Sequence, residues 1–199
     1  MNYLAHTYLS GENDEIKVGN FLGDWVKGSD YLKYPENIQT GIVLHRNIDS
    51  FIDSHPIMKV GASRFQSRYF KYSGVIIDIL YDHYLASNWK DFSPIPLREY
   101  INGLHKLIFN YQAMLPPRLQ NYAPTFMKER WIERYANLEG IRDVLDAMSK
   151  RTSLPNETSF AISVIETFYE EFRQEFFDFF GQIIEFVENK FLISIPRVT

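Results

Sequence analysis

Two segments of the chain carry histidine and aspartate residues at helical spacing. In GIVLHRNIDSFIDSHP, residues 41–56, His45 and Asp49 are four positions apart, and Asp53 follows one turn later. An α-helix places residues four apart on one face, so this imidazole and this carboxylate should point the same way. The pair could hold a divalent metal ion from one rigid element, with Arg46 beside it to contact a phosphate oxygen. Ion pairs within ordinary helices have the same spacing, so this motif alone leaves both interpretations open.

The second segment, VIIDILYDHYLASNW at residues 75–89, contains Asp78, Asp82 and His83 among residues that are otherwise mostly apolar. A helix that is apolar nearly all round is normally buried. Buried carboxylates must become neutral or find cations, so a shared metal ion or an arginine is expected near Asp78 and Asp82. An ordinary surface pair is the alternative for Asp82 and His83 alone. We expect all three side chains to face the 41–56 segment.

Two N-terminal residues could join these clusters. His6 lies within the apolar sequence LAHTYL, and Asp24 lies within GNFLGDWVKG. Taken singly, His6 is also typical of a hydrogen-bonded core histidine and Asp24 of the edge of an amphipathic helix. His55 is interpreted as structural or surface, and His105 has no acidic neighbours.

The combined set of imidazoles and carboxylates, without cysteine, suits Mn, Fe, Mg or Zn. A hydrolytic metal of this kind lowers the pKa of bound water. The chain has no glycine-rich phosphate loop and no G-x-S-x-G motif. These residues therefore predict metal-dependent phosphoester hydrolysis on a helical scaffold.

Charge is unevenly distributed along a chain whose formal net charge is −4. Residues 57–72 contain Lys59, Arg64, Arg68 and Lys71 and no acidic residue, whereas residues 156–188 contain eight acidic residues and one arginine. The net charge disfavours general nucleic-acid binding. The basic segment could bind a phosphate or one acidic partner, or it could be a solvated helix face.

The elements that must position these residues are expected to be helices throughout, in one all-α domain spanning residues 1–199. The expected helices are residues 2–10, 14–27, 36–53, 57–67, 73–88, 96–113, 124–135, 138–150 and 158–189. In the last of them, apolar residues recur every three or four positions from Ile162 to Phe186, which indicates core packing. Residues 70–81 are also compatible with a strand, but their length and continuation favour a helix.

The expected location is the cytoplasm. The chain has no cysteine, no basic N-terminal region before an apolar segment, and no apolar run that approaches the roughly 18–20 residues of a membrane span. No membrane association is therefore predicted, and the sequence does not indicate an oligomeric state.

The motifs resemble those of the acyl carrier protein phosphodiesterase family. The matching blocks are MNYLAH, GNFLGDWVKG, GIVLHRNIDSFIDSHP, RYFKYSGVIIDILYDHYLASNW and WIERYANLEGIRDVLDAMSKR, so the resemblance runs from residue 1 to about residue 151. It implies a helical bundle distantly related to HD-domain phosphohydrolases. The chain has HRNID and a reversed Asp82-His83 pair in place of the adjacent His-Asp pair of that larger superfamily.

The resemblance also implies an activity: removal of the 4′-phosphopantetheine arm from holo acyl carrier protein, with manganese as the expected metal. Mapped onto this chain, it implies a role for His45, Asp49, Asp78, Asp82 and His83, with His6 and Asp24 as additional ligands or acid–base groups. We assign Asp24, His45, Arg46 and Asp49 to catalysis. Since the carrier protein is acidic, Arg64, Arg68 and Lys71 are assigned to binding it or its phosphate.

Two other functions remain open from the sequence. An HD-like phosphohydrolase acting on a nucleotide or another small phosphoester would use the same histidines and aspartates. A non-catalytic helical module could instead bind an acidic partner through residues 59–71.

Overall fold

The computed structural model describes residues 3–198, and within this range the chain is helical without a strand, as expected. The first half contains α1 (Tyr3–Tyr8), α2 (Asp14–Leu22), η1 (Asp30–Lys33), α3 (Glu36–Ser54), α4 (Pro56–Ser63), α5 (Gln66–Tyr69), η2 (Phe70–Tyr72) and α6 (Ser73–Ser87). The second half contains η3 (Trp89–Asp91), α7 (Leu97–Asn110), η4 (Gln112–Met114), α8 (Pro117–Glu129), α9 (Trp131–Arg134), α10 (Leu138–Arg151), α11 (Thr158–Thr167) and α12 (Tyr169–Phe191). The η elements are short 3₁₀ helices. The expected start of the first helix at residue 2 lies outside the described residues.

Several expected helix boundaries were wrong. The helix expected at residues 124–135 is the second half of α8, which begins at Pro117 and continues through Pro124, followed after a break at Arg130 by α9. Pro117 lies in the first turn of α8, where its missing N–H would have no helical partner. Pro124 is internal, where a proline removes one backbone hydrogen bond and strains the helix locally. The helix expected at residues 158–189 is two helices, which are separated at Phe168 without any glycine or proline to mark the break.

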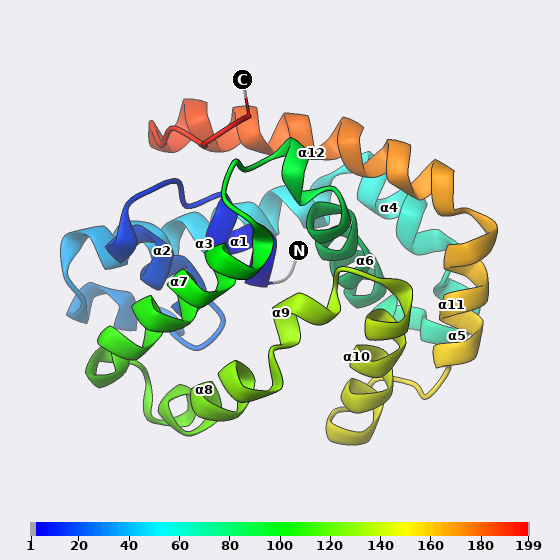
Figure 1. Cartoon of the computed structure of the whole chain (residues 1–199), viewed down its shortest axis with the longest axis horizontal. Coiled ribbons are helices and arrows are strands. Elements are labelled where there is room, and N and C mark those ends of the chain that lie inside the picture. The colour runs from blue at the N-terminus through cyan, green and yellow to red at the C-terminus, as the bar shows by residue number, and fades with distance from the viewer. Residues whose placement is uncertain (1–2, 199) are drawn as a thin grey trace.

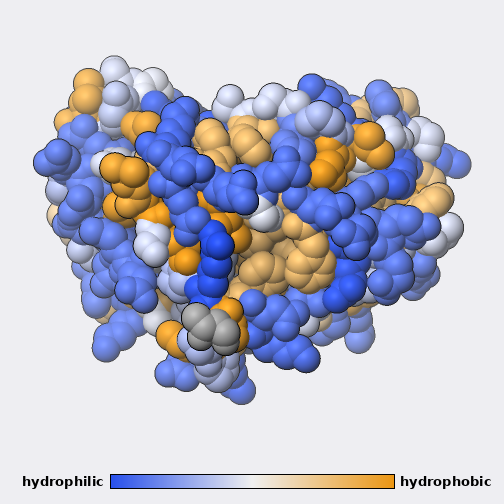
Figure 2. All heavy atoms as spheres, turned by 90° about the horizontal axis from the view of Figure 1, so that it is seen from above, coloured by the Kyte–Doolittle hydropathy of each residue, from blue (hydrophilic) through white to orange (hydrophobic). Residues whose placement is uncertain are grey.

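The long C-terminal helix α12 covers one side of the molecule and contacts α3, α4 and α6 (Figure 1). Its phenylalanines Phe172, Phe176 and Phe179 are buried in the hydrophobic core, which confirms the interpretation of the phenylalanine pattern as core packing. Seen from above, hydrophilic residues cover most of this side, with hydrophobic residues between them (Figure 2). None of the helices within residues 3–198 combines the length and hydrophobicity that a membrane span requires.

Helices α2 and α3 pack together at very short distance because both carry glycine at the contact. A Cβ atom on Gly19 would lie 2.2 Å from the carbonyl oxygen of Ile38, and one on Gly41 would lie 2.1 Å from that of Ile16. Real Cβ atoms do not approach that closely, so larger residues would push the helices apart. This close packing brings Asn20 on α2 next to His45 on α3.

Helix α6 runs through the core, as its apolar circumference predicts. Tyr81, Tyr84 and Leu85 are fully buried, and so is the carboxylate-bearing Asp82. The strand alternative for residues 70–81 is therefore excluded, and the polar residues of α6 must find partners inside the protein.

Candidate metal centre

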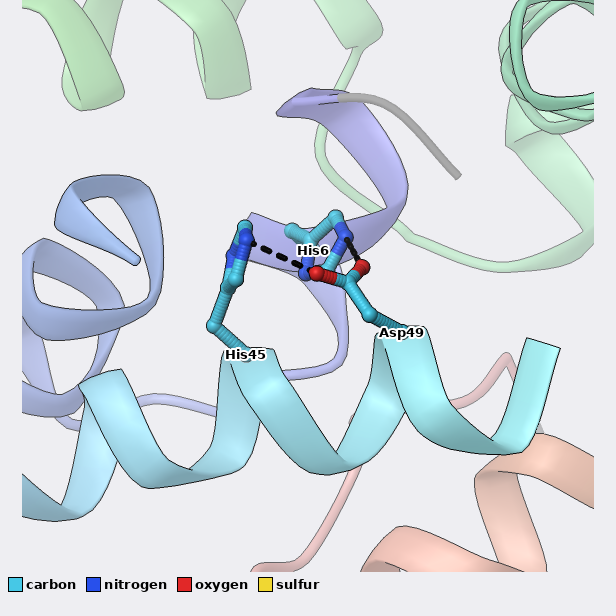
Figure 3. Close-up of side chains that lie close together, drawn as sticks. All are labelled: His6, His45 and Asp49. Carbon is cyan, nitrogen blue, oxygen red and sulfur yellow. Dashed lines mark ion pairs between the residues drawn. The ribbon is translucent and has the colours of Figure 1, made fainter. Parts of the chain in front are cut away.

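Three of the predicted site residues meet between α1 and α3, namely His6, His45 and Asp49. Asp49 lies between two imidazoles: its Oδ1 is 3.3 Å from His6 Nε2, and its Oδ2 is 3.2 Å from His45 Nε2 (Figure 3). The imidazole rings stack with their centroids 4.2 Å apart. One ligand atom from each residue can be chosen so that all three lie within 4.8 Å of one another. Two imidazoles and a carboxylate at this spacing could hold a metal ion.

Asn20 fixes which nitrogen each histidine presents to the site. Its Nδ2 donates to the backbone oxygen of His6 at 2.7 Å, which determines the orientation of the amide. Its Oδ1 then faces Nδ1 of His6 at 2.8 Å and Nδ1 of His45 at 3.2 Å. An amide oxygen can only accept, so both Nδ1 atoms must carry a proton and donate. In the neutral form of either ring, Nε2 therefore has a free lone pair directed at Asp49.

Replacing Asn20 by alanine should weaken manganese binding about 10–100-fold, because residues that orient a ligand imidazole typically have effects of this size. The affinity can be measured by manganese titration. Ser10→Ala is the control: it removes the 2.9 Å contact between Ser10 Oγ and the Asn20 amide but leaves both histidine contacts in place. It should change the affinity less than threefold. Equal affinity in Asn20→Ala and the wild type would contradict this role.

The two imidazoles differ in charge. Burial lowers the pKa of His6 in spite of the adjacent Asp49, so this ring is neutral near pH 7. Burial opposes protonation of His45 as well, but hydrogen bonds and charges from Asp24 and Asp49 outweigh it and raise the pKa to about 9. Burial would raise the pKa of Asp49, yet the two histidines hold it well below its usual range. Neutral His6 Nε2 and ionised Asp49 are thus two facing acceptors, which a shared cation would satisfy.

This difference predicts a specific pH dependence of metal binding. A metal ion takes the unprotonated imidazole, so binding must displace one proton from His45 and none from His6. The apparent association constant should rise about tenfold per pH unit from pH 6.5 to 8.5, because the folded-state pKa of His45 lies above that range. Calorimetry in buffers of different ionisation enthalpy should show release of about one proton. An affinity independent of pH would contradict the assignment of His45.

His6, His45 and Asp49 line a pocket of about 350 Å³ whose walls contain further carboxylates. Asp24, Asp53 and Asp78 line it with Asp49, and no lysine or arginine lies among its lining residues. Asp24 Oδ1 is 3.5 Å from His45 Nε2, and this contact lowers the pKa of Asp24. Four aspartates beside two buried histidines make the pocket strongly attractive to cations. The residues present therefore fit a divalent metal.

Gly23 lets His45 occupy its position. It ends α2, and a Cβ atom on it would lie 2.0 Å from Cγ of His45. Any larger residue would displace the imidazole. The GNFLGDW segment therefore supplies the contact to both histidines (Asn20), the space for His45 (Gly23) and a carboxylate (Asp24). The sequence pattern indicated Asp24 but not Asn20, although a polar residue in an apolar segment is a signal for such a role.

Asp82 does not belong to this group of ligands, although the sequence predicted it as one. Its carboxylate accepts hydrogen bonds from the backbone N–H of Leu4 at 3.0 Å and of Ala5 at 3.3 Å. It thus satisfies the first turn of α1, the helix that carries His6. Asp78 lies one turn earlier on the same face of α6 and does line the pocket.

His83 and Arg46 also lie apart from the group. His83 Nδ1 donates to the backbone oxygen of Tyr135 at 2.8 Å, and its Nε2 contacts the hydroxyl of Tyr169 at 2.9 Å. Arg46 donates to the backbone oxygen of Val26 at 3.0 Å, and its guanidinium lies over the ring of Tyr31. Both have structural partners in the described chain, and neither lines the pocket.

Two of the basic residues in the 57–72 segment lie beside acidic residues of the same chain. Arg64 forms two hydrogen bonds with Glu175, of 2.9 and 2.7 Å, and lies over the ring of Phe172. Arg68 is mostly exposed and lies 3.8 Å from Glu157. Lys71 is exposed on η2, immediately before α6.

Comparison with known proteins assigns this chain to a family. A sequence profile described as acyl carrier protein phosphodiesterase matches residues 1–183, and so covers every residue of the pocket. The chain belongs to the acyl carrier protein phosphodiesterase family. The match extends beyond residue 151, where the sequence resemblance was expected to end, and includes most of α12.

Relatives named acyl carrier protein phosphodiesterase align over nearly the whole chain. The protein of Pectobacterium atrosepticum is 35% identical over 191 residues, which is 96% of this chain and 99% of the relative. The protein of Yersinia pestis is 31% identical over the same shares. That of Photorhabdus laumondii is 30% identical over 99% of this chain and 100% of its own. No solved structure matches, so the likeness to HD-domain phosphohydrolases stays a prediction.

Proposed function

We propose that this protein hydrolyses the phosphodiester that joins 4′-phosphopantetheine to a serine of holo acyl carrier protein. Family membership supports the substrate, and the His6–His45–Asp49 group carries the chemistry. The pocket contains no lysine or arginine to neutralise a phosphodiester, so a divalent cation is required to offset the charge of four aspartates and the substrate. Manganese is the metal we propose, and a cytoplasmic location stays a prediction.

His6, His45 and Asp49 would hold the cation, which when bound would lower the pKa of water and stabilise charge on the phosphoryl oxygens. Asn20 holds both imidazoles in the orientation that this requires. Asp24 is ionised, mostly exposed and next to His45, so it can orient a water molecule and accept its proton. Asp78 adds a further carboxylate from the opposite wall.

In the reaction, the oxygen of water forms a bond to phosphorus, and the bond between phosphorus and the serine oxygen breaks. One proton of the water passes to a base, for which we propose Asp24, and the serine oxygen on leaving takes up one proton, returned from this base directly or through water. The products are apo carrier protein and free 4′-phosphopantetheine.

We propose that the carrier protein docks beside η2. Lys71 precedes Val75, a pocket-lining residue, by one helical turn, and the exposed Phe70 lies next to it. Charge reversal at an exposed docking position mainly slows association, and salt screens the effect. Lys71→Glu should raise KM for holo carrier protein about threefold to tenfold at low salt and less at high salt. Lys106→Glu, on α7 away from η2, is the control. An unchanged KM in Lys71→Glu would remove this surface from docking.

The activity can be tested directly. The protein is incubated with holo carrier protein and manganese, and loss of the prosthetic group is followed by mass spectrometry. We expect conversion to apo protein, and none after chelation of the metal. Unchanged holo protein with manganese, magnesium, iron and zinc would overturn the substrate. Faster hydrolysis of nucleotides or other small phosphoesters would favour a general phosphohydrolase, and a stable protein that binds no metal would favour a binding module.

A further inference from the structure

A second pocket, mainly apolar, lies beside the metal centre. Its volume is about 290 Å³, close to the lower limit for small-molecule sites. Aromatic and small apolar side chains from α8, α9 and α10 and the turns beside them form its walls: Tyr122, Phe126, Trp131, Tyr135, Val144 and Ala147. Such walls suit a flexible, largely apolar ligand, because most of the binding free energy comes from burying its surface.

This pocket adjoins the metal centre. Met148 lines both, so its side chain forms a shared wall. Helix α1 contributes a residue to each of the two sites: Tyr3 lines the apolar pocket, and His6, one turn later, belongs to the metal group. A ligand whose phosphate lies at the metal group could therefore reach the apolar pocket past the side chain of Met148.

The far end of α10 links the pocket to the proposed docking surface. Arg151 and Thr152 line the pocket, and the next residue, Ser153, contacts the hydroxyl of Tyr72 on η2 at 2.7 Å. Arg151 is about half exposed; its guanidinium lies over the ring of Trp131, and its Nη2 lies 3.3 Å from Oε1 of Glu129. The docking surface, the metal centre and the apolar pocket are thus neighbours.

We propose that the apolar pocket binds the pantetheine portion of the substrate, an inference that rests on the proposed function. In holo carrier protein the phosphate lies between the serine and the arm, so an arm whose phosphate is at the metal centre must occupy space beside that centre. The arm has a dimethyl-substituted carbon next to the phosphate end, which aromatic walls can bury. It also has two amides, whose carbonyl oxygens Arg151 can reach as a donor at the edge of the pocket.

The test places a larger side chain in the pocket. Ala147 is half-buried on α10 and lines the pocket, so Ala147→Phe would occupy the space of the arm. Ala113→Phe makes the same change at an exposed position outside both pockets. Ala147→Val takes less space and provides a second variant if phenylalanine prevents folding.

Two measurements distinguish binding of the pantetheine arm from hydrolysis of the phosphodiester. The first is calorimetric binding of free pantetheine, which has no phosphate and needs no turnover. The second is the kcat/KM for holo carrier protein divided by that for bis(p-nitrophenyl) phosphate, a small diester without the arm. In Ala147→Phe both should fall at least tenfold, in Ala147→Val by a smaller factor, and in Ala113→Phe neither should change.

Failure of this proposal is distinguishable from failure of the proposed function. If the wild type binds pantetheine and Ala147→Phe does not, but holo carrier protein is never hydrolysed, the function is wrong while the pocket is correctly assigned. If the wild type hydrolyses holo carrier protein but binds no pantetheine, or Ala147→Phe leaves both readouts unchanged, the pocket assignment is wrong. Tighter binding of adenosine than of pantetheine would also overturn it, in favour of a nucleotide.

Discussion

Replacing Asp49 by asparagine should lower kcat/KM for holo acyl carrier protein by at least a thousandfold, a loss of about 4 kcal/mol in transition-state stabilisation. Asp49 contacts Nε2 of both histidines through its two oxygens, so the substitution removes the charge shared by the whole group. The shape of the side chain is kept, so the loss reports on charge and metal binding. Metal content after dialysis against manganese should fall in parallel.

A comparison on the same helix makes this prediction specific. Asp53 is one turn further along α3 and lines the pocket, but the ion pairs of His6 and His45 on this helix are with Asp49. Asp53→Asn should therefore cost less than tenfold and leave the metal content unchanged. Similar losses in the two variants would mean that the pocket acts only through its total negative charge.

Replacing Asp82 by alanine should destabilise the protein by about 3 kcal/mol, because two buried backbone N–H groups lose a charged acceptor. For a chain of this size, that free energy corresponds to a fall in Tm of about 10 °C. The change also frees the first turn of α1, so activity should fall through displacement of His6. Thermal unfolding of the metal-free protein measures the effect.

Measuring Tm without metal distinguishes the structural role of Asp82 from the metal-binding role of Asp49. Asp82→Asn keeps one oxygen acceptor and should lose about half as much stability as Asp82→Ala, whereas Asp49→Asn should leave Tm within a few degrees of the wild type. If Asp82→Ala kept its metal-free Tm but lost manganese, Asp82 would be a ligand, as the sequence analysis expected.

The sequence predicted the helical fold because apolar periodicity depends on local spacing alone. The regular phenylalanines of α12 and the apolar circumference of α6 both indicated burial, and both are buried. Boundaries were less predictable where no turn residue marks them. The chain breaks at Phe168, where no glycine or proline marks an end, and continues through Pro124, which on local preference would mark one.

The site was only partly predictable, for a related reason. His45 and Asp49 share one helix, so their spacing places them together, and His6 was found as a polar residue in an apolar segment. Leu4, whose backbone N–H donates to Asp82, lies 78 positions away in the sequence. Spacing along α6 therefore cannot tell whether Asp82 binds a metal or accepts hydrogen bonds from the backbone of another helix. The role of Asn20 likewise depends on the close packing of α2 and α3, which no single segment encodes.

The central claim is that His6, His45 and Asp49 hold the cation that the reaction needs. Anomalous diffraction from crystals grown with manganese, recorded at the manganese absorption edge, tests it most directly. We expect a peak about 2.0–2.3 Å from Nε2 of His6, Nε2 of His45 and a carboxylate oxygen of Asp49. A peak at Asp82 and His83, or no peak within reach of His6 and His45 in crystals of active protein, would contradict the claim.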